Sequence, residues 1–170
     1  MNHFIRLLID KFLLYALLAL AMPLPAQAAS ADDIADGMNL FMQKGGCPLC
    51  HGWAGDGRKT DNQMPDGANL RDSALTRDLI VMTIQCGRPG RSMPAYDRFA
   101  YSGDGRCYGM KPGDLKNNPL PDPPNTLQMH EIERIADFLF AKVIKQGAMD
   151  HAKCVAFWGK ESEVCSEFRK

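Results

Sequence analysis

The sequence of 170 residues lacks several features that would place it in a common functional class. It has no excess of positive charge, because its 20 basic residues are matched by 20 acidic ones, and nucleic-acid binding would require a clearly basic face. Its N-terminal apolar run, "FLLYALLALAM", has eleven residues, whereas a membrane-spanning helix needs roughly 20. There is also no internal repeat, no low-complexity tract and no convincing strand pattern. We therefore expect an all-α protein that binds no nucleic acid.

Residues 1–28 are predicted to be a cleaved secretory signal peptide. Basic residues precede the apolar run, and "PAQAAS" then offers an Ala-x-Ala cleavage site ending at Ala28. We expect residues 29–170 to form a single exported domain in the periplasm, monomeric and free of the membrane once the signal is removed. An oxidising compartment makes disulfides the default for cysteines that have no other role.

Three helices are predicted from hydrophobic spacing and from residues typical of helix ends. Ser30 is placed to cap the first helix and Gly45 with Gly46 to end it, while Asn125 and Gln128 are expected to form a capping box before the last. Between the second and last helices, and again after the last, glycine and proline interrupt any regular pattern, although the tail has room for one short helix. The predicted helices cover about 30–44, 76–86 and 127–146.

The segment "GGCPLCHGW" carries the clearest chemical motif, two cysteines separated by two residues and followed by a histidine. A structural zinc site would need a second close pair of ligands, and the remaining cysteines form no second C-x-x-C. A thiol redox pair would need a neighbouring βαβ unit, and no strands are predicted here.

Covalent haem attachment accounts for every residue of this motif. Cys47 and Cys50 would each form a thioether with one haem vinyl group, and the adjacent His51 would be the proximal iron ligand. The motif occurs once, so we expect one haem c.

The second axial ligand is predicted to be Met93, which lies in the irregular segment "CGRPGRSMPAYD" directly after a helix. Pro94 fixes the backbone next to it. Met110 in "CYGMKPG" is the reserve candidate and Met64 follows it. His130 and His151 could in principle provide a second histidine ligand instead. Because His and Met together saturate the iron and a thioether favours Fe(II), this ligation indicates an electron carrier and not an enzyme.

These residues resemble class I cytochromes c. The matching elements are the first helix, "CPLCHG", a Gly/Pro loop, "GRSMPAY" and the last helix "EIERIADFL". The resemblance implies an all-α fold of three to five helices around one covalently bound haem. It also implies that the first and last helices cross near Gly37 and Phe138 or Leu139, and that the carbonyl of Pro65 in "MPDGANL" accepts the His51 Nδ1 proton.

Two departures from the family pattern are a long insertion after the Met ligand, residues 94–126, and a C-terminal extension, residues 147–170. Four cysteines remain after haem attachment, and they could form two disulfides in three ways or stay unpaired. We favour Cys86–Cys107, which would join the two ends of the segment that carries Met93, and Cys154–Cys165, which would pin the extension.

The details "CGRPG", "DRFAY", "RCYGM" and the tail are similar to periplasmic cytochromes that accept electrons from quinoprotein (PQQ-dependent) alcohol or methanol dehydrogenases. The expected partners are thus such a dehydrogenase as donor and a cytochrome or terminal oxidase as acceptor. Arg88, Arg91, Lys44 and Lys59 could help to steer an acidic partner, or simply form a solvated surface of mixed charge. The alternatives are a haem sensor or peroxidase-like protein with a labile sixth ligand, and a permanently bound subunit of a larger oxidoreductase. The sequence suggests no role for Trp53.

Overall fold

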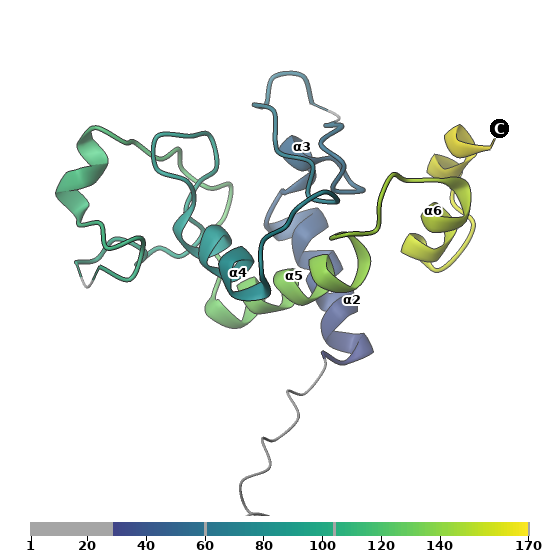
Figure 1. Ribbon diagram of the computed structural model, residues 1–170, viewed down its shortest axis with the longest axis horizontal. Coiled ribbons are helices and arrows are strands. Elements are labelled where there is room, and N and C mark those ends of the chain that lie inside the picture. The colour runs from purple at the N-terminus through teal and green to yellow at the C-terminus, as the bar shows by residue number, and fades with distance from the viewer. Residues whose placement is uncertain (1–28, 60, 104, 170) are drawn as a thin grey trace, which may run out of the picture.

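The computed structural model describes residues 29–59, 61–103 and 105–169, so the predicted signal peptide lies outside the described part of the chain (Figure 1). The described residues form helices, turns and bends and no strand, as expected for an all-α protein. In chain order the elements are α2 (Ala31–Asn39), the π-helical η1 (Leu40–Lys44), α3 (Pro48–His51), α4 (Arg77–Cys86), the 3-10 helix η2 (Pro112–Lys116), α5 (Met129–Lys142), α6 (His151–Trp158) and the 3-10 helix η3 (Glu163–Phe168). No helix among these residues is both long enough and apolar enough to cross a membrane.

The helix ends follow the predicted local signals except at the last helix, which was predicted over 127–146 and covers Met129–Lys142, because the backbone leaves helical geometry at Val143 (φ −124°). The Ser30 side chain caps α2, as predicted, and the Thr76 side chain caps α4, although the prediction had counted Thr76 as the first helical residue. The last helix is different, because its capping box joins Gln128 to Glu131 and not to Asn125. The Asn125 side chain instead donates to the Lys44 carbonyl at 2.9 Å, a contact across 81 positions that local spacing does not reveal.

The centre of the fold is the crossing of α2 with α5 (Figure 1), at the place that the family resemblance implied. A Cβ atom on Gly37 would lie 2.0 Å from the Arg134 carbonyl oxygen and 2.9 Å from the Phe138 Cβ, so only glycine permits this approach. One turn further along, the rings of Phe41 and Phe138 lie 5.5 Å apart. Both rings are fully buried, and the crossing therefore holds the first and last helices against one core.

We expect Gly37→Ala to lower the free energy of unfolding by about 2 kcal/mol or more, because the added methyl group must push the helices apart. Alanine would otherwise favour a helix by roughly 1 kcal/mol, so a loss can come only from the crossing. Chemical denaturation of the folded protein measures the effect. Gly113→Ala is the matched control, because a Cβ atom there would meet nothing within 4 Å. Equal stability of the two variants would contradict the close approach.

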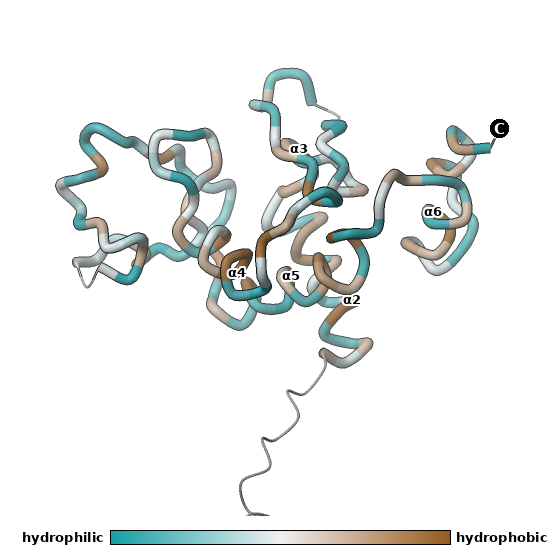
Figure 2. The backbone as a smooth tube through the Cα atoms, in the orientation of Figure 1, coloured by the Kyte–Doolittle hydropathy of each residue, from teal (hydrophilic) through white to brown (hydrophobic). Residues whose placement is uncertain are grey.

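Two groups of segments extend from this centre in opposite directions. The loops of the insertion lie on one side of the α2–α5 pair, and α6 with η3 lies on the other (Figure 1). Hydrophobic residues concentrate on the central helices, while the insertion loops are mostly hydrophilic (Figure 2). Cys86–Cys107 joins the end of α4 to the insertion, and Cys154–Cys165 joins α6 to η3 within the extension, which confirms the predicted pairing.

Trp53 fixes the C-terminal extension to the rest of the fold. Its ring centroid lies 5.3 Å from that of Phe157, 5.5 Å from that of Trp158 and 6.4 Å from that of Phe168. Edge-to-face and tilted ring contacts of this kind stabilise beyond the burial of area alone. Trp53 therefore packs against the extension, although the sequence had suggested no role for it.

The buried Arg71 makes a second connection to the extension. Its guanidinium donates to the Ala54 carbonyl at 3.3 Å and to the carbonyl of Gly147, where the extension begins. Its own carbonyl accepts from the Lys145 amide at 2.9 Å. The side chain of Arg71 thus satisfies backbone groups of two segments at once, which explains why a charged residue is only 3% exposed.

Candidate functional site

The C-P-L-C-H motif forms a single helical turn, α3, between two glycine turns. Pro48 stands at the first position of the turn, where its missing N–H costs nothing, and Cys47 precedes it as the cap. Gly46 and Gly52 adopt positive φ values of 60° and 72° on either side. A Cβ atom on Gly52 would lie 2.5 Å from the Arg58 carbonyl oxygen. The chain therefore ends its first helix before Cys47 and leaves the motif immediately after His51.

The His51 ring is held by a backbone carbonyl. Its Nδ1 lies 2.8 Å from the carbonyl oxygen of Ala68, so Nδ1 must carry the proton and donate it. The family resemblance had implied Pro65, which is wrong by three positions. The Gly67 amide donates to the Cys50 carbonyl at 3.0 Å, and this bond presents the following carbonyl to the ring.

This bond leaves Nε2 of His51 as the nitrogen with a free lone pair. Among the residues that the structure describes, Nε2 has no hydrogen-bond partner. Burial lowers the pKa of His51, and the positive charge of Arg88 lowers it further. Both effects favour the neutral imidazole, which is the form that ligates a metal.

The two thiols of the motif are the cysteines that remain outside the disulfides. Burial raises the pKa of Cys47 to about 12 and also raises that of Cys50. A catalytic redox pair needs the opposite, a thiol whose pKa is lowered. A four-cysteine zinc site is also disfavoured, because the other four cysteines are consumed by disulfides.

Met93 lies in a short loop that closes on itself directly after α4. The Arg88 amide donates to the Met93 carbonyl at 3.0 Å, and the chain then runs back along α4, where the Tyr96 amide donates to the Ile84 carbonyl at 3.2 Å. Met93 is half-buried against the main hydrophobic core, and so is Cys47. The electrostatic effect of Arg88 on His51 also relates this loop to the motif.

The other candidate ligands lie in different surroundings. Met110 follows the Cys107 turn and Met64 lies in the loop where its carbonyl accepts from Lys59, and neither belongs to the main core. His130 is exposed at the start of α5, and His151 on α6 lies 3.2 Å from a Glu161 oxygen. Of the three methionines considered as ligands, Met93 packs against the core that Cys47 also borders, and Met64 and Met110 do not.

Tyr96 is a residue of the site that sequence reasoning missed. Its hydroxyl donates to the Gly45 carbonyl at 2.6 Å, and its carbonyl accepts from the Leu127 amide at 2.9 Å. Burial raises the pKa of Tyr96, so the phenol remains a donor. Tyr96 therefore joins the segment after Met93 to the turn before Cys47. The sequence carries only a weak signal of this role, a tyrosine in an irregular segment. Such a tyrosine needs a hydrogen-bond partner for its hydroxyl when it is buried, but the sequence does not indicate which one.

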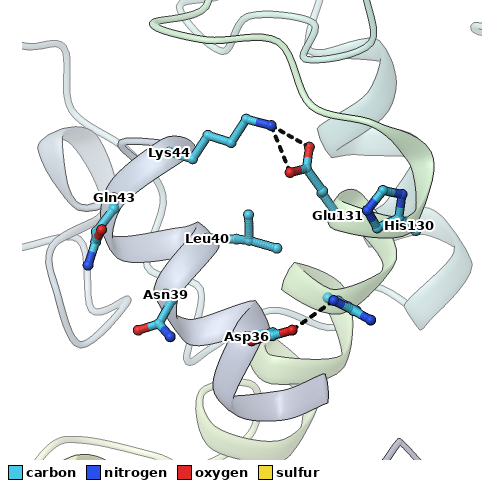
Figure 3. A pocket seen from close by; sticks show the side chains of 8 residues that line it. Asp36, Asn39, Leu40, Gln43, Lys44, His130 and Glu131 are labelled. Carbon is cyan, nitrogen blue, oxygen red and sulfur yellow. Dashed lines mark hydrogen bonds and ion pairs between the residues drawn. The ribbon is translucent and has the colours of Figure 1, made fainter. Parts of the chain in front are cut away.

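A separate hollow of about 290 Å³ lies between α2, η1 and the start of α5 (Figure 3). It contains none of the four residues predicted to hold the haem. Lys44 pairs with Glu131 at 2.7 Å across it (Figure 3). Arg134 pairs with Asp36, also at 2.7 Å. These pairs join η1 and α2 to α5, which makes the hollow part of the helix crossing.

Comparison with protein-family models, with curated proteins and with solved structures finds no match for this chain. Among the residues that the structure describes, no cluster of three or more His, Cys, Asp or Glu side chains has the arrangement of a metal site.

The donor set of the motif fits a c-type haem. Cys47 and Cys50 lie on one helical turn as free thiols, which is what two thioether bonds require. His51 keeps Nε2 free because Nδ1 is fixed by a carbonyl. Met93 offers a thioether in a loop that is held in place on both sides. These four residues would hold the group.

Proposed function

We propose that this protein is a monohaem c-type cytochrome that carries single electrons between other proteins. Haem with His and Met ligands supplies a one-electron Fe(III)/Fe(II) couple with no open coordination position. The observation that carries the proposal is the state of the motif, two free thiols beside an imidazole whose Nδ1 donates to the Ala68 carbonyl. In the proposal Cys47 and Cys50 attach the haem, and His51 and Met93 bind its iron.

The chain's own residues keep this site rigid, and rigidity is what electron transfer requires of a protein. The Ala68 carbonyl fixes the His51 ring, and Tyr96 ties the two ligand segments together. A ligand set that keeps one geometry in both oxidation states needs little rearrangement when an electron arrives or leaves. The fold therefore supports a carrier better than a catalyst, which would need an open position on the iron.

The proposed location is the periplasm. Two disulfides support an oxidising compartment, where cytochrome c maturation also takes place. The proposed donor, a quinoprotein alcohol or methanol dehydrogenase, rests on the sequence resemblance of the insertion and tail. Arg88 and Arg91 are exposed on the Met93 loop and form no ion pair within the described part of the chain, which suits an acidic partner.

Visible spectroscopy of the purified holoprotein tests the function. We expect the oxidised protein to show the weak long-wavelength absorption band of a thioether-to-iron bond, which we call the sulfur–iron band. We also expect the reduced protein not to bind carbon monoxide rapidly, since both axial positions are filled. Rapid carbon monoxide binding without a sulfur–iron band would instead indicate a sensor or a peroxidase-like protein.

A further inference from the structure

The loop that carries Met93 is tied to the insertion at its entry and near its middle. Cys86, the last residue of α4, forms the disulfide with Cys107. The Tyr101 hydroxyl donates to the Cys86 carbonyl at 2.8 Å, and the Tyr108 hydroxyl donates to the Gly87 carbonyl at 2.9 Å. Further along the loop, the Gly90 amide donates to the Pro119 carbonyl at 3.1 Å.

The two tyrosine hydroxyls provide hydrogen-bond donors for backbone carbonyls at the C-terminal end of α4. The last carbonyls of a helix have no intrahelical partner and must find one elsewhere. Cys86 and Gly87 are buried, so water is a poor substitute for the phenols. Burial raises the pKa of Tyr101 to about 12, with a further contribution from nearby Tyr108, which keeps its hydroxyl protonated.

The backbone at Tyr108 is itself strained to make this contact. Its φ is +58°, in a region that bulky side chains rarely adopt. Such strain persists only where the surrounding structure imposes it, and here the neighbouring Cys107 is fixed by the disulfide. Strain at a residue that holds another segment is typical of a position with a specific task.

The insertion also has a small core of its own. Cys86, Ala100 and Cys107 are buried together, apart from the main core, and Met82, Ala95 and Tyr101 pack around them. The attachments to the Met93 loop therefore come from a locally packed unit. A loose surface loop could not hold its neighbour in this way.

We infer that residues 100–103 and 105–119 act as a brace that holds the Met93 loop in its ligating position, with Tyr101 and Tyr108 as the positioning residues. The inference rests on the proposed function, because it concerns Met93 as an iron ligand. A ligand from solution can replace Met93 only in the fraction of molecules whose loop has moved away. The two hydroxyls reduce that fraction by holding the carbonyls at the entry to the loop.

The test uses the holoprotein with Tyr101→Phe, Tyr108→Phe and both changes together. Each substitution keeps the ring and removes the hydroxyl that holds one carbonyl. We titrate the oxidised protein with imidazole and follow the loss of the sulfur–iron band. One hydrogen bond changes an equilibrium by about 2- to 12-fold, so the double variant, which loses two, should bind imidazole about 4- to 140-fold more tightly than the wild type.

Two controls separate positioning from general stability. Thr83→Val removes a side-chain hydrogen bond to the Leu79 carbonyl on the same helix, at 2.6 Å, and leaves the brace intact. Cys154→Ser with Cys165→Ser weakens the distant extension. Both controls should keep the wild-type imidazole affinity within about twofold, although the second should melt at a lower temperature.

The possible results distinguish the brace from the function on which it rests. A wild-type protein with the sulfur–iron band, together with a folded double variant of unchanged imidazole affinity, overturns the brace alone. Equal changes in the tyrosine variants and the controls overturn it too. A wild-type protein without the band overturns the assignment of Met93 and the brace with it. If the double variant does not fold, the Tyr108→Phe single variant decides by the same titration.

Discussion

Replacing both Cys47 and Cys50 with serine is expected to abolish the proposed covalent attachment of haem. Serine hydroxyls form no thioether with vinyl groups, and no other free cysteine exists in the described part of the chain. Denaturing electrophoresis with haem staining, followed by mass determination of the intact chain, measures the loss. Because Cys47 and Met93 border the main core, loss of the proposed haem should also lower helical content.

The control for this change removes the same number of cysteines elsewhere. Cys154→Ser with Cys165→Ser opens the disulfide of the extension and should keep the haem, while lowering stability by about 2–3 kcal/mol in the chain-entropy account. Covalent haem on the Cys47 and Cys50 double variant would overturn the proposed attachment. Stoichiometric zinc in the wild type and none in the variant would favour the zinc interpretation.

Met93→Leu should eliminate the sulfur–iron band and lower the midpoint potential. Leucine nearly conserves the volume of methionine, so the half-buried position keeps its packing and loses only the sulfur. Axial ligands set haem potentials over about 0.8 V, and loss of a thioether that favours Fe(II) should cost on the order of 0.1–0.2 V. Spectroelectrochemical titration gives the potential and the band in one experiment.

Met110→Leu and Met64→Leu are the matched controls, because both methionines were candidates for the same position. Each should keep the sulfur–iron band and a potential within a small fraction of the expected shift. Should the band survive Met93→Leu and vanish with Met110→Leu, the ligand would be Met110. We would then expect carbon monoxide to bind the reduced Met110 variant rapidly and not the reduced Met93 variant.

Sequence reasoning succeeded where a feature depends on neighbouring residues. The helix cap at Ser30 and the end of the first helix at Gly45 and Gly46 follow from local propensities, whereas the Thr76 cap and the helical turn of the motif were not predicted. The two disulfides were also predicted correctly, one connectivity among three. For Cys154 and Cys165 the short separation of 11 positions made pairing easy, since little chain has to be ordered to bring them together.

Sequence reasoning failed where a side chain forms its hydrogen bond with a residue on another segment of the chain. The acceptor for His51 Nδ1 is Ala68 and not Pro65, because the register of the loop is set by the bond from Gly67 to the Cys50 carbonyl. Neither residue type signals this role, since any residue supplies a carbonyl. Asn125 likewise contacts Lys44 and takes no part in capping the last helix.

The sequence by itself determined where the three main helices lie and which cysteines could form disulfides, and it suggested the chemistry proposed for the C-P-L-C-H turn. Each of these depends on spacing along the chain or on residue type. Only the tertiary structure decided that Trp53 anchors the extension, that Tyr96 joins the two ligand segments, and that Tyr101 and Tyr108 hold the entry to the Met93 loop. The physical reason is that a phenol or indole finds its partner through the fold, across distances along the chain that no local pattern encodes.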